Sequence, residues 1–293
     1  MKKPTVEILI NENPGRKRQK LVEPSGTITR LPTLASSENV TGKVIINLNS
    51  SKTFEHKGIK LELLGSIQTA KDQKDIMRFI SLSKELSSPN TLNRDKTTFP
   101  FAFNNAPKQH ETYRGASKNV KYILRLTIET RFRSLTYDQE FFVINPQPIT
   151  SLDDEDNKPI QLEFDIDNVL HVLFDVQKSH YGVKGMLEGC FTFLKVGNRF
   201  SAMEMQIIRK EVENVSGAKP DTKVIVRYEI MDGGPIKNEV IPFVLDLKPY
   251  KLGPTMINIG NKFSVRYYIN LVLNYDQSRV DRQHEIVLHR IEK

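Results

Sequence analysis

Apolar and polar residues alternate with a period of two over most of the chain. The alternation is clear in residues 44–48 (VIINL), 59–63 (IKLEL), 124–128 (LRLTI) and 203–207 (MEMQI). Successive side chains of a β-strand point to opposite faces, so this pattern predicts half-buried strands. Clusters rich in Asn, Gly and Pro, such as residues 104–107 (NNAP), separate the strands. Short strands with regular turns are typical of sandwiches made of antiparallel sheets.

One segment, residues 75–86, also fits a helix. Ile76, Phe79 and Ile80 would share one helical face. Ile80 and Leu82 fit the alternation of a strand equally well. The pattern leaves both structures open for this segment.

The two halves of the chain resemble each other. Four segments of the first half recur in the same order in the second half, each about 145 residues later. In one pair a glycine, Gly42 or Gly189, enters an alternating strand. Preserved order and spacing argue against chance similarity, so we predict an all-β chain of two tandem immunoglobulin-like β-sandwiches. The pairs are 40–46 with 187–193, 99–103 with 241–245, 120–128 with 265–273, and 140–144 with 285–289.

The middle of the chain has the composition of a linker. Residues 145–159 combine three prolines with four consecutive acids at 153–156, a composition that suits a solvated connection. A calcium loop is not expected there because the run lacks the alternating ligands and the turn glycine. We predict an N-terminal sandwich over residues 1–148, a linker over 149–159 and a C-terminal sandwich over 160–293.

Composition narrows the class of protein. Of the 293 residues, 38% are hydrophobic and 27% charged, as in soluble globular proteins. No apolar run approaches the roughly 20 residues that cross a bilayer, and the N-terminus lacks the apolar segment of a signal peptide, so we expect a cytoplasmic protein. The net charge of +8 favours an anionic partner. Because the basic residues are spread along the chain, no nucleic-acid partner is expected.

No residues have the spacing of a catalytic or metal site. The single cysteine, Cys190, cannot form an internal disulfide, and its alternating surroundings favour an inert thiol over a nucleophile. His171 lies in a similar segment, where a surface or hydrogen-bonded histidine is expected. A nucleophile elbow, a phosphate-binding loop and a dinucleotide fingerprint are missing from the sequence. We therefore expect a binding protein, with no catalytic residues, no metal and no cofactor.

Residues 228–233 (YEIMDG) place two apolar side chains directly before a tight turn. If exposed, Met231 would supply an adaptable contact and Ile230 a rigid one to a partner. Apolar residues beside turns are more often buried, so the local pattern by itself favours closure of the sandwich core.

A set of motifs runs in order from the first predicted strands to the last. Together the motifs resemble the arrestin-like subunit of retromer, an endosomal sorting coat. Residues 228–233 and 263–273 are the most specific of them. In residues 1–39 the glycine- and phenylalanine-rich opening of that family is absent, and a basic stretch, residues 16–20, stands in its neighbourhood. The motifs are 40–44 (VTGKV), 54–62 (FEHKGIKLE), 84–86 (KEL), 169–172 (VLHV), 203–211 (MEMQIIRKE), 228–233 (YEIMDG), 262–267 (KFSVRY) and 270–273 (NLVL).

The resemblance implies an arrestin-like fold and a non-catalytic scaffold for cargo recognition. Such a subunit serves retrieval of membrane proteins from endosomes to the trans-Golgi network or plasma membrane. It is cytoplasmic and associates with endosomal membranes peripherally and indirectly. In the family the C-terminal sandwich docks on the large α-solenoid subunit of retromer. The turn that matches Ile230, Met231, Asp232 and Gly233 carries this contact, which reverses the local preference for a core role.

The resemblance also implies a cargo site in the crease between the sandwiches. There the family holds the cytosolic tails of membrane cargo together with a phox-homology sorting nexin. Phe164 matches an apolar pocket position of this crease. Where the family places an aromatic before its last strand, this chain offers Val280 or Asp281. An aspartate there disfavours burial of an apolar cargo side chain because the charge would be desolvated.

A second interpretation of the sequence, as an adaptor that works without retromer, remains open. A retromer-independent arrestin-like adaptor would bind receptor tails or ubiquitin ligases. Such an adaptor is expected to carry a phosphate-sensing polar core and a regulatory tail. This sequence ends at Lys293, a few residues after its last predicted strand, which favours the retromer reading.

Overall fold

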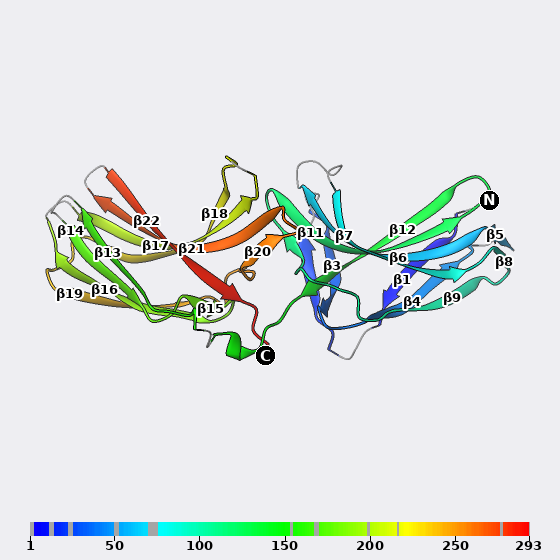
Figure 1. Cartoon of the computed structure of the whole chain (residues 1–293), viewed down its shortest axis with the longest axis horizontal. Coiled ribbons are helices and arrows are strands. Elements are labelled where there is room, and N and C mark those ends of the chain that lie inside the picture. Colours follow the sequence, from blue (N-terminus) through cyan, green and yellow to red (C-terminus); the bar gives the residue numbers. More distant parts are fainter. Residues whose placement is uncertain are drawn as a thin grey trace. The chain divides into compact units, whose positions relative to one another are not determined.

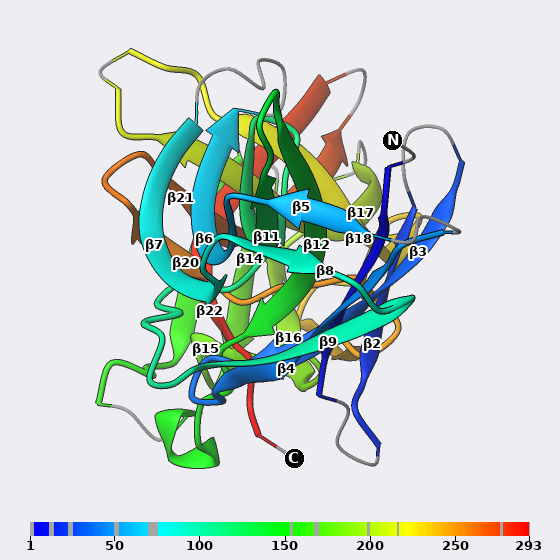
Figure 2. The same ribbon diagram turned by 90° about the vertical axis from the view of Figure 1, so that its right-hand side faces the viewer.

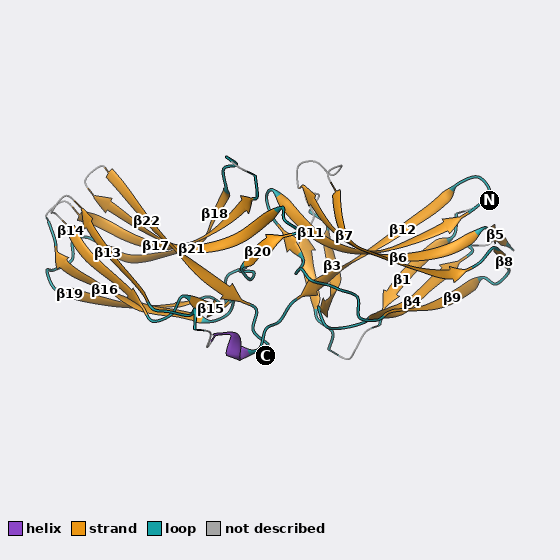
Figure 3. Cartoon of the chain, viewed as in Figure 1, coloured by secondary structure: helices purple, strands orange, loops and turns teal. Residues whose placement is uncertain are grey.

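The computed structural model of the chain is built almost entirely from β-strands (Figures 1 and 3). Besides the strands, the described part contains one short 3-10 helix, η1 (Ile149–Leu152). The chain divides into two compact units, Met1–Asn145 and Pro146–Lys293. Each unit contains two main sheets with a shared apolar core, which confirms the predicted all-β fold of two arrestin-like sandwiches. The structure describes residues 3–11, 15–22, 26–49, 53–69, 76–152, 155–166, 170–197, 200–215, 217–275 and 278–292.

The first unit pairs a small sheet with a larger one, and Figure 2 views it from the end that carries β5 and β8. The small sheet has the order β1-β4-β9, and the larger sheet has the order β2-β3-β12-β11-β6-β7, with β10 paired to β11. A short ribbon, β5 with β8, lies beside them. The bounds are β1 (Thr5–Ile10), β2 (Arg18–Val22), β3 (Ile28–Ala35), β4 (Val40–Asn47), β5 (Phe54–His56), β6 (Gly58–Thr69), β7 (Ile76–Ser87), β8 (Asn90–Leu92), β9 (Lys96–Phe103), β10 (Tyr113–Arg114), β11 (Lys118–Glu129) and β12 (Ser134–Ile144).

The second unit has the same plan. Its smaller sheet has the order β13-β14-β16-β19, and its larger sheet has the order β15-β22-β21-β17-β18, with β20 paired to β21. Phe174, Phe191 and Phe243 pack in its core with ring centroids 5.0–5.9 Å apart. The bounds are β13 (Ile160–Ile166), β14 (Leu170–Val176), β15 (His180–Gly182), β16 (Met186–Lys195), β17 (Phe200–Glu213), β18 (Asp221–Asp232), β19 (Glu239–Asp246), β20 (Met256–Ile259), β21 (Phe263–Tyr275) and β22 (Ser278–His289).

The pairing of strands bears out the internal repeat. The order β3-β12-β11-β6-β7 of the first unit corresponds to β15-β22-β21-β17-β18 of the second. The first strand pair in each order is parallel, namely β3 with β12 and β15 with β22. The other strand pairs in the two orders are antiparallel. A shared strand order that includes this exceptional parallel pair is what duplication of one sandwich produces.

Two buried tyrosines occupy matching places in the repeat. Tyr122 on β11 and Tyr267 on β21 are both almost fully buried. The Tyr122 hydroxyl donates to the His110 carbonyl at 2.6 Å. The Tyr267 hydroxyl accepts a hydrogen bond from the Gly253 amide at 3.2 Å. A buried hydroxyl needs a hydrogen-bond partner. In each sandwich the tyrosine hydroxyl finds that partner in a backbone group of the preceding loop, and this bond links the loop to the central strand.

The segment that fits both a helix and a strand is strand β7, from Ile76 to Ser87. It pairs with β6 along its whole length, and Gly65 lies opposite Ile80. Only Ile80 of its apolar residues is fully buried, whereas Ile76 is 46% exposed. Pairing with a neighbouring strand, which a local pattern does not reveal, decides between the two structures. Residue 75, the first of the ambiguous segment, lies outside the described residues.

Residues 149–159, the predicted linker, belong to the second unit. Asn157 anchors the described part of this segment: its Oδ1 accepts from the Ser179 and His180 amides at 2.9 Å, and its Nδ2 donates to the Leu152 carbonyl at 2.6 Å. Just before them, Gln147 forms a parallel bridge with Ile291. One side-chain amide thus satisfies three backbone groups and ties a segment whose composition suggests only a solvated connection to the start of β15.

Candidate functional site: the turn between β18 and β19

Strand β18 lies at the edge of the larger sheet of the second unit. Within the described residues its one sheet neighbour is β17. After Asp232 the chain turns through residues 233–238 into β19. Gly233 has a φ of 106° and Asn238 a φ of 66°, which are left-handed conformations that glycine and asparagine tolerate. The turn therefore has a backbone conformation that its own residues favour.

A β-bulge precedes the turn. Met231 lies opposite Met203, but Glu229 lies opposite the next residue, Glu204, so Ile230 is the extra residue of β18. A bulge bends the strand and breaks the strict alternation of side chains between two faces. Both Ile230 and Met231 are half-buried here, whereas Met203 is fully buried. The bulge thus leaves two adjacent apolar side chains partly open to solvent.

The turn adds one more apolar group that the sequence pattern did not single out. Ile236 is 75% exposed. Its backbone amide donates to Glu239 Oε2 at 2.7 Å, and the Glu239 amide donates to the Ile236 carbonyl at 3.0 Å. These bonds hold the turn while the Ile236 side chain remains outside, and Asp232 and Gly233 are exposed beside it. The arrangement is a small apolar surface with a polar margin, suited to docking on a groove.

The three residues expected at the crease lie in the second unit but on different sheets. Phe164 on β13 is 4% exposed and lies opposite Val172, so it faces the sandwich core. Val280 on β22 lies opposite the fully buried Leu273 and is half-buried. Asp281 alternates with Val280 and is exposed. Of the three, Asp281 is the most exposed, with 38% of its side chain accessible.

Asp281 is held by polar neighbours. Arg279 donates from Nε to Oδ2 and from Nη2 to Oδ1, both at 3.0 Å. Asn270 donates to Oδ1, also at 3.0 Å. Hydrogen bonds from Arg279 in the first place, and from Asn270, hold the pKa of Asp281 below its ordinary value of 3.8. The carboxylate is therefore charged at neutral pH and already satisfied within the protein.

A scan against family models matches residues 1–278 to the family described as vacuolar protein sorting-associated protein 26. The chain belongs to this family. It is 34% identical over 291 residues to vacuolar protein sorting-associated protein 26B of Arabidopsis thaliana, covering 98% of this chain and 94% of the plant protein. It is 36% identical over 291 residues to the 26B protein of Homo sapiens, covering 97% of this chain and 84% of the human one. The resemblance that the sequence motifs indicate is thereby confirmed.

A third relative, vacuolar protein sorting-associated protein 26 of Caenorhabditis elegans, is 38% identical over 259 residues. The match covers 86% of this chain and 70% of the nematode protein. Relatives from a plant, a mammal and a nematode all match across both sandwiches, so family membership applies to the chain as a whole.

The other two residues considered for chemistry, His171 and Cys190, have environments that disfavour reactivity. His171 contacts Glu163 Oε1 through Nε2 at 2.5 Å, which is the hydrogen-bonded surface histidine expected from its strand. Cys190 is half-buried, and burial, with a smaller contribution from Asp175, raises the pKa of its thiol, which disfavours the reactive thiolate. Across the described ranges, no group of three or more His, Cys, Asp or Glu side chains is arranged to hold a metal ion. No helix among these residues is long and apolar enough to span a membrane.

Proposed function

We propose that this family member is a non-catalytic core subunit of retromer that docks on the large α-solenoid subunit through the turn after β18. The observation that carries the proposal is the bulge at Ile230, which leaves Ile230 and Met231 half-exposed beside an exposed turn. Partly exposed apolar side chains on an edge strand are available to a partner. Family membership supports the role in vacuolar protein sorting.

The energetics favour a small contact dominated by few residues. Burying the exposed part of Ile230 and of Met231 stabilises a complex by at most about 2 kcal/mol each. Ile236 adds a further apolar group, while Asp232 and Gly233 contribute to the rim. Interfaces of this kind depend on a few central anchors enclosed by residues of little energetic weight.

The test is a pull-down of the purified chain from the cytosol of its source cell, followed by mass spectrometry. The intact chain is expected to retain a large α-solenoid protein, and the Ile230→Asp, Met231→Asn variant is expected to lose it. The melting temperature should change little, because both side chains are only half-buried. A large fall in melting temperature would instead assign the two residues to the core and overturn the docking proposal.

The proposal extends to cargo. Cytosolic tails of membrane proteins and a phox-homology sorting nexin would bind this subunit, with Phe164, Val280 and Asp281 of the second unit as the candidate contact residues. The subunit would be cytoplasmic and would reach endosomal membranes through these partners. If the pull-down returns receptor tails or ubiquitin ligases and no solenoid, a retromer-independent adaptor takes its place.

A further inference from the structure

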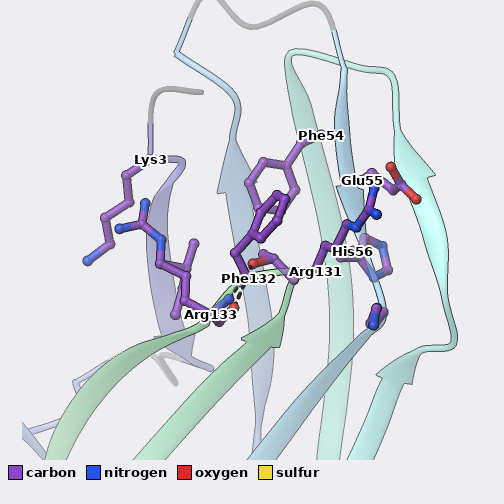
Figure 4. Close-up of a pocket in the computed structure, with 10 residues that line it drawn as sticks. Lys3, Phe54, Glu55, His56, Arg131, Phe132 and Arg133 are labelled. Carbon is purple, nitrogen blue, oxygen red and sulfur yellow. Dashed lines mark hydrogen bonds between the residues drawn. The ribbon is translucent and has the colours of Figure 1, made fainter.

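A pocket of about 760 Å³ opens in the first unit, at the end where the β11–β12 hairpin turns (Figure 4). Three segments that are far apart in the sequence form it: Lys3, residues 54–57 around β5, and residues 130–135 of the hairpin. This volume is in the range that holds a small ligand or a head group. The docking turn after β18 belongs to the other unit.

The charge of the lining is strongly positive. Lys3, Lys57, Arg131 and Arg133 contribute four cations, and all four side chains are exposed. Glu55 is the one acid of the lining. It alternates with the buried His56 along β5, so its side chain turns to the opposite face of that strand. The positive charges therefore have little compensation within the pocket.

His56 is the second observation that points to a ligand. Its side chain forms part of the pocket wall and is only 2% exposed. Neither ring nitrogen has a hydrogen-bond partner among the described residues. Burial lowers the pKa of His56, so at neutral pH the ring carries one N–H donor without an acceptor. Buried polar groups are nearly always paired, and an unpaired one at a pocket wall suggests an acceptor that binds there.

The rim of the pocket carries an aromatic side chain. Phe132 is 89% exposed at the tip of the hairpin, between Arg131 and Arg133. The Arg131 guanidinium lies 5.6 Å from the centre of the Phe132 ring. The turn beneath is fixed by hydrogen bonds between Thr130 and Arg133. A rigid tip thus presents one apolar ring flanked by two cations.

We propose that this pocket binds a phosphate monoester anion, either the phosphorylated head group of a membrane lipid or a free inositol phosphate. The guanidinium groups of Arg131 and Arg133 match phosphate oxygens in geometry, and the two lysines add point charges. The unpaired N–H of His56 would reach an anion oxygen after the ring turns toward the pocket. Phe132 favours the lipid source, because an aromatic ring beside cations suits the interface of a membrane.

The test uses the purified full chain without partners. Titration calorimetry with inositol hexakisphosphate should detect binding by the native protein. Arg131→Glu with Arg133→Glu should weaken it by about tenfold or more, since two charge-assisted contacts are lost. The matched control, Lys43→Glu with Lys84→Glu, makes the same change of net charge at exposed positions of the same unit outside the pocket and should bind as the native protein does. His56→Leu should reduce affinity with no change of charge at neutral pH.

Sedimentation with vesicles distinguishes the two sources. Vesicles of phosphatidylcholine with phosphatidylinositol phosphate should retain the native chain, and phosphatidylcholine alone should not. If Phe132→Ala lowers vesicle binding but not calorimetric binding, the ligand is the lipid head group. If only the soluble anion binds, the ligand is free. Absence of binding in both assays, or equal weakening by the control pair, would overturn the proposal without bearing on the docking turn.

Discussion

Gly189 on β16 lies directly opposite Phe243 on β19. A Cβ atom at Gly189 would stand 2.3 Å from the Asp175 carbonyl oxygen and 3.0 Å from the Phe243 ring. Gly42 and Phe101 repeat this relationship in the first sandwich, with a Cβ at 2.8 Å from the ring. Each sandwich therefore depends on a glycine that lets a phenylalanine from the neighbouring strand cover its backbone.

Replacement of Gly189 by alanine should destabilise the second sandwich. The added methyl group meets backbone and ring atoms that cannot move aside, and overpacking of this kind costs about 1–3 kcal/mol. Differential scanning calorimetry should report a lower melting temperature for Gly189→Ala. Gly234→Ala is the matched control, because nothing lies within 4 Å of its Cβ position. Equal melting temperatures for both variants would refute this role of Gly189.

Ile236 should contribute to the docking of the second unit. An aspartate there places a charge in the proposed apolar contact, so Ile236→Asp should weaken capture of the solenoid subunit by about tenfold. Ile257→Asp serves as the control, since Ile257 is 55% exposed on β20. Binding is measured by surface plasmon resonance with the captured solenoid. Equal weakening by both variants would remove Ile236 from the interface.

Asp281 should titrate below its ordinary range. In the folded protein its pKa lies below 3.8, mainly because of the hydrogen bond from Arg279. The ionised carboxylate therefore stabilises the fold above pH 3.8, and this stabilisation is lost as the pH falls through the lower pKa of the folded state. Carboxyl chemical shifts followed by NMR should give a midpoint below 3.8, and Arg279→Ala should raise it. An unchanged midpoint in that variant would mean that Arg279 is not the cause.

Cargo preference should respond to the charge at Asp281. The native chain is expected to bind peptides with apolar sorting signals more weakly than Asp281→Phe or Val280→Phe, because a charged carboxylate resists desolvation. Fluorescence anisotropy with labelled peptides provides the comparison. Equal affinity of all three proteins would show that this turn does not select cargo.

Buried histidines should make the first sandwich less stable in acid. Burial lowers the pKa of both His56 and His110 from 6.5, so the neutral form dominates in the fold and the unfolded chain binds more protons. The contribution of the two neutral histidines to the free energy of unfolding is present above pH 6.5. It is lost as the pH falls through their pKa values in the folded protein. The melting temperature should therefore drop between about pH 7 and pH 5, and His56→Leu with His110→Leu should flatten this dependence. A fall of equal slope in the double variant would contradict the assignment.

The alternation of side chains predicts most of the strands, because period two is a local property that one segment carries by itself. The repeat of residues 120–128 in 265–273 likewise predicts two sandwiches, and β11 and β21 occupy equivalent central positions. The turn of residues 228–233 could be identified by its motif, but not the exposure of its side chains.

Three further features were decided by the tertiary structure alone: the conformation of β7, the exposure of Ile230 and the cationic pocket. Strand β7 is a strand because β6 pairs with it, and Ile230 is half-exposed because the register shifts between β17 and β18. The cationic pocket joins Lys3, β5 and the β11–β12 hairpin, which no local pattern links. Such features depend on which distant segments pair and in which register, and that choice follows from the packing of the whole sandwich.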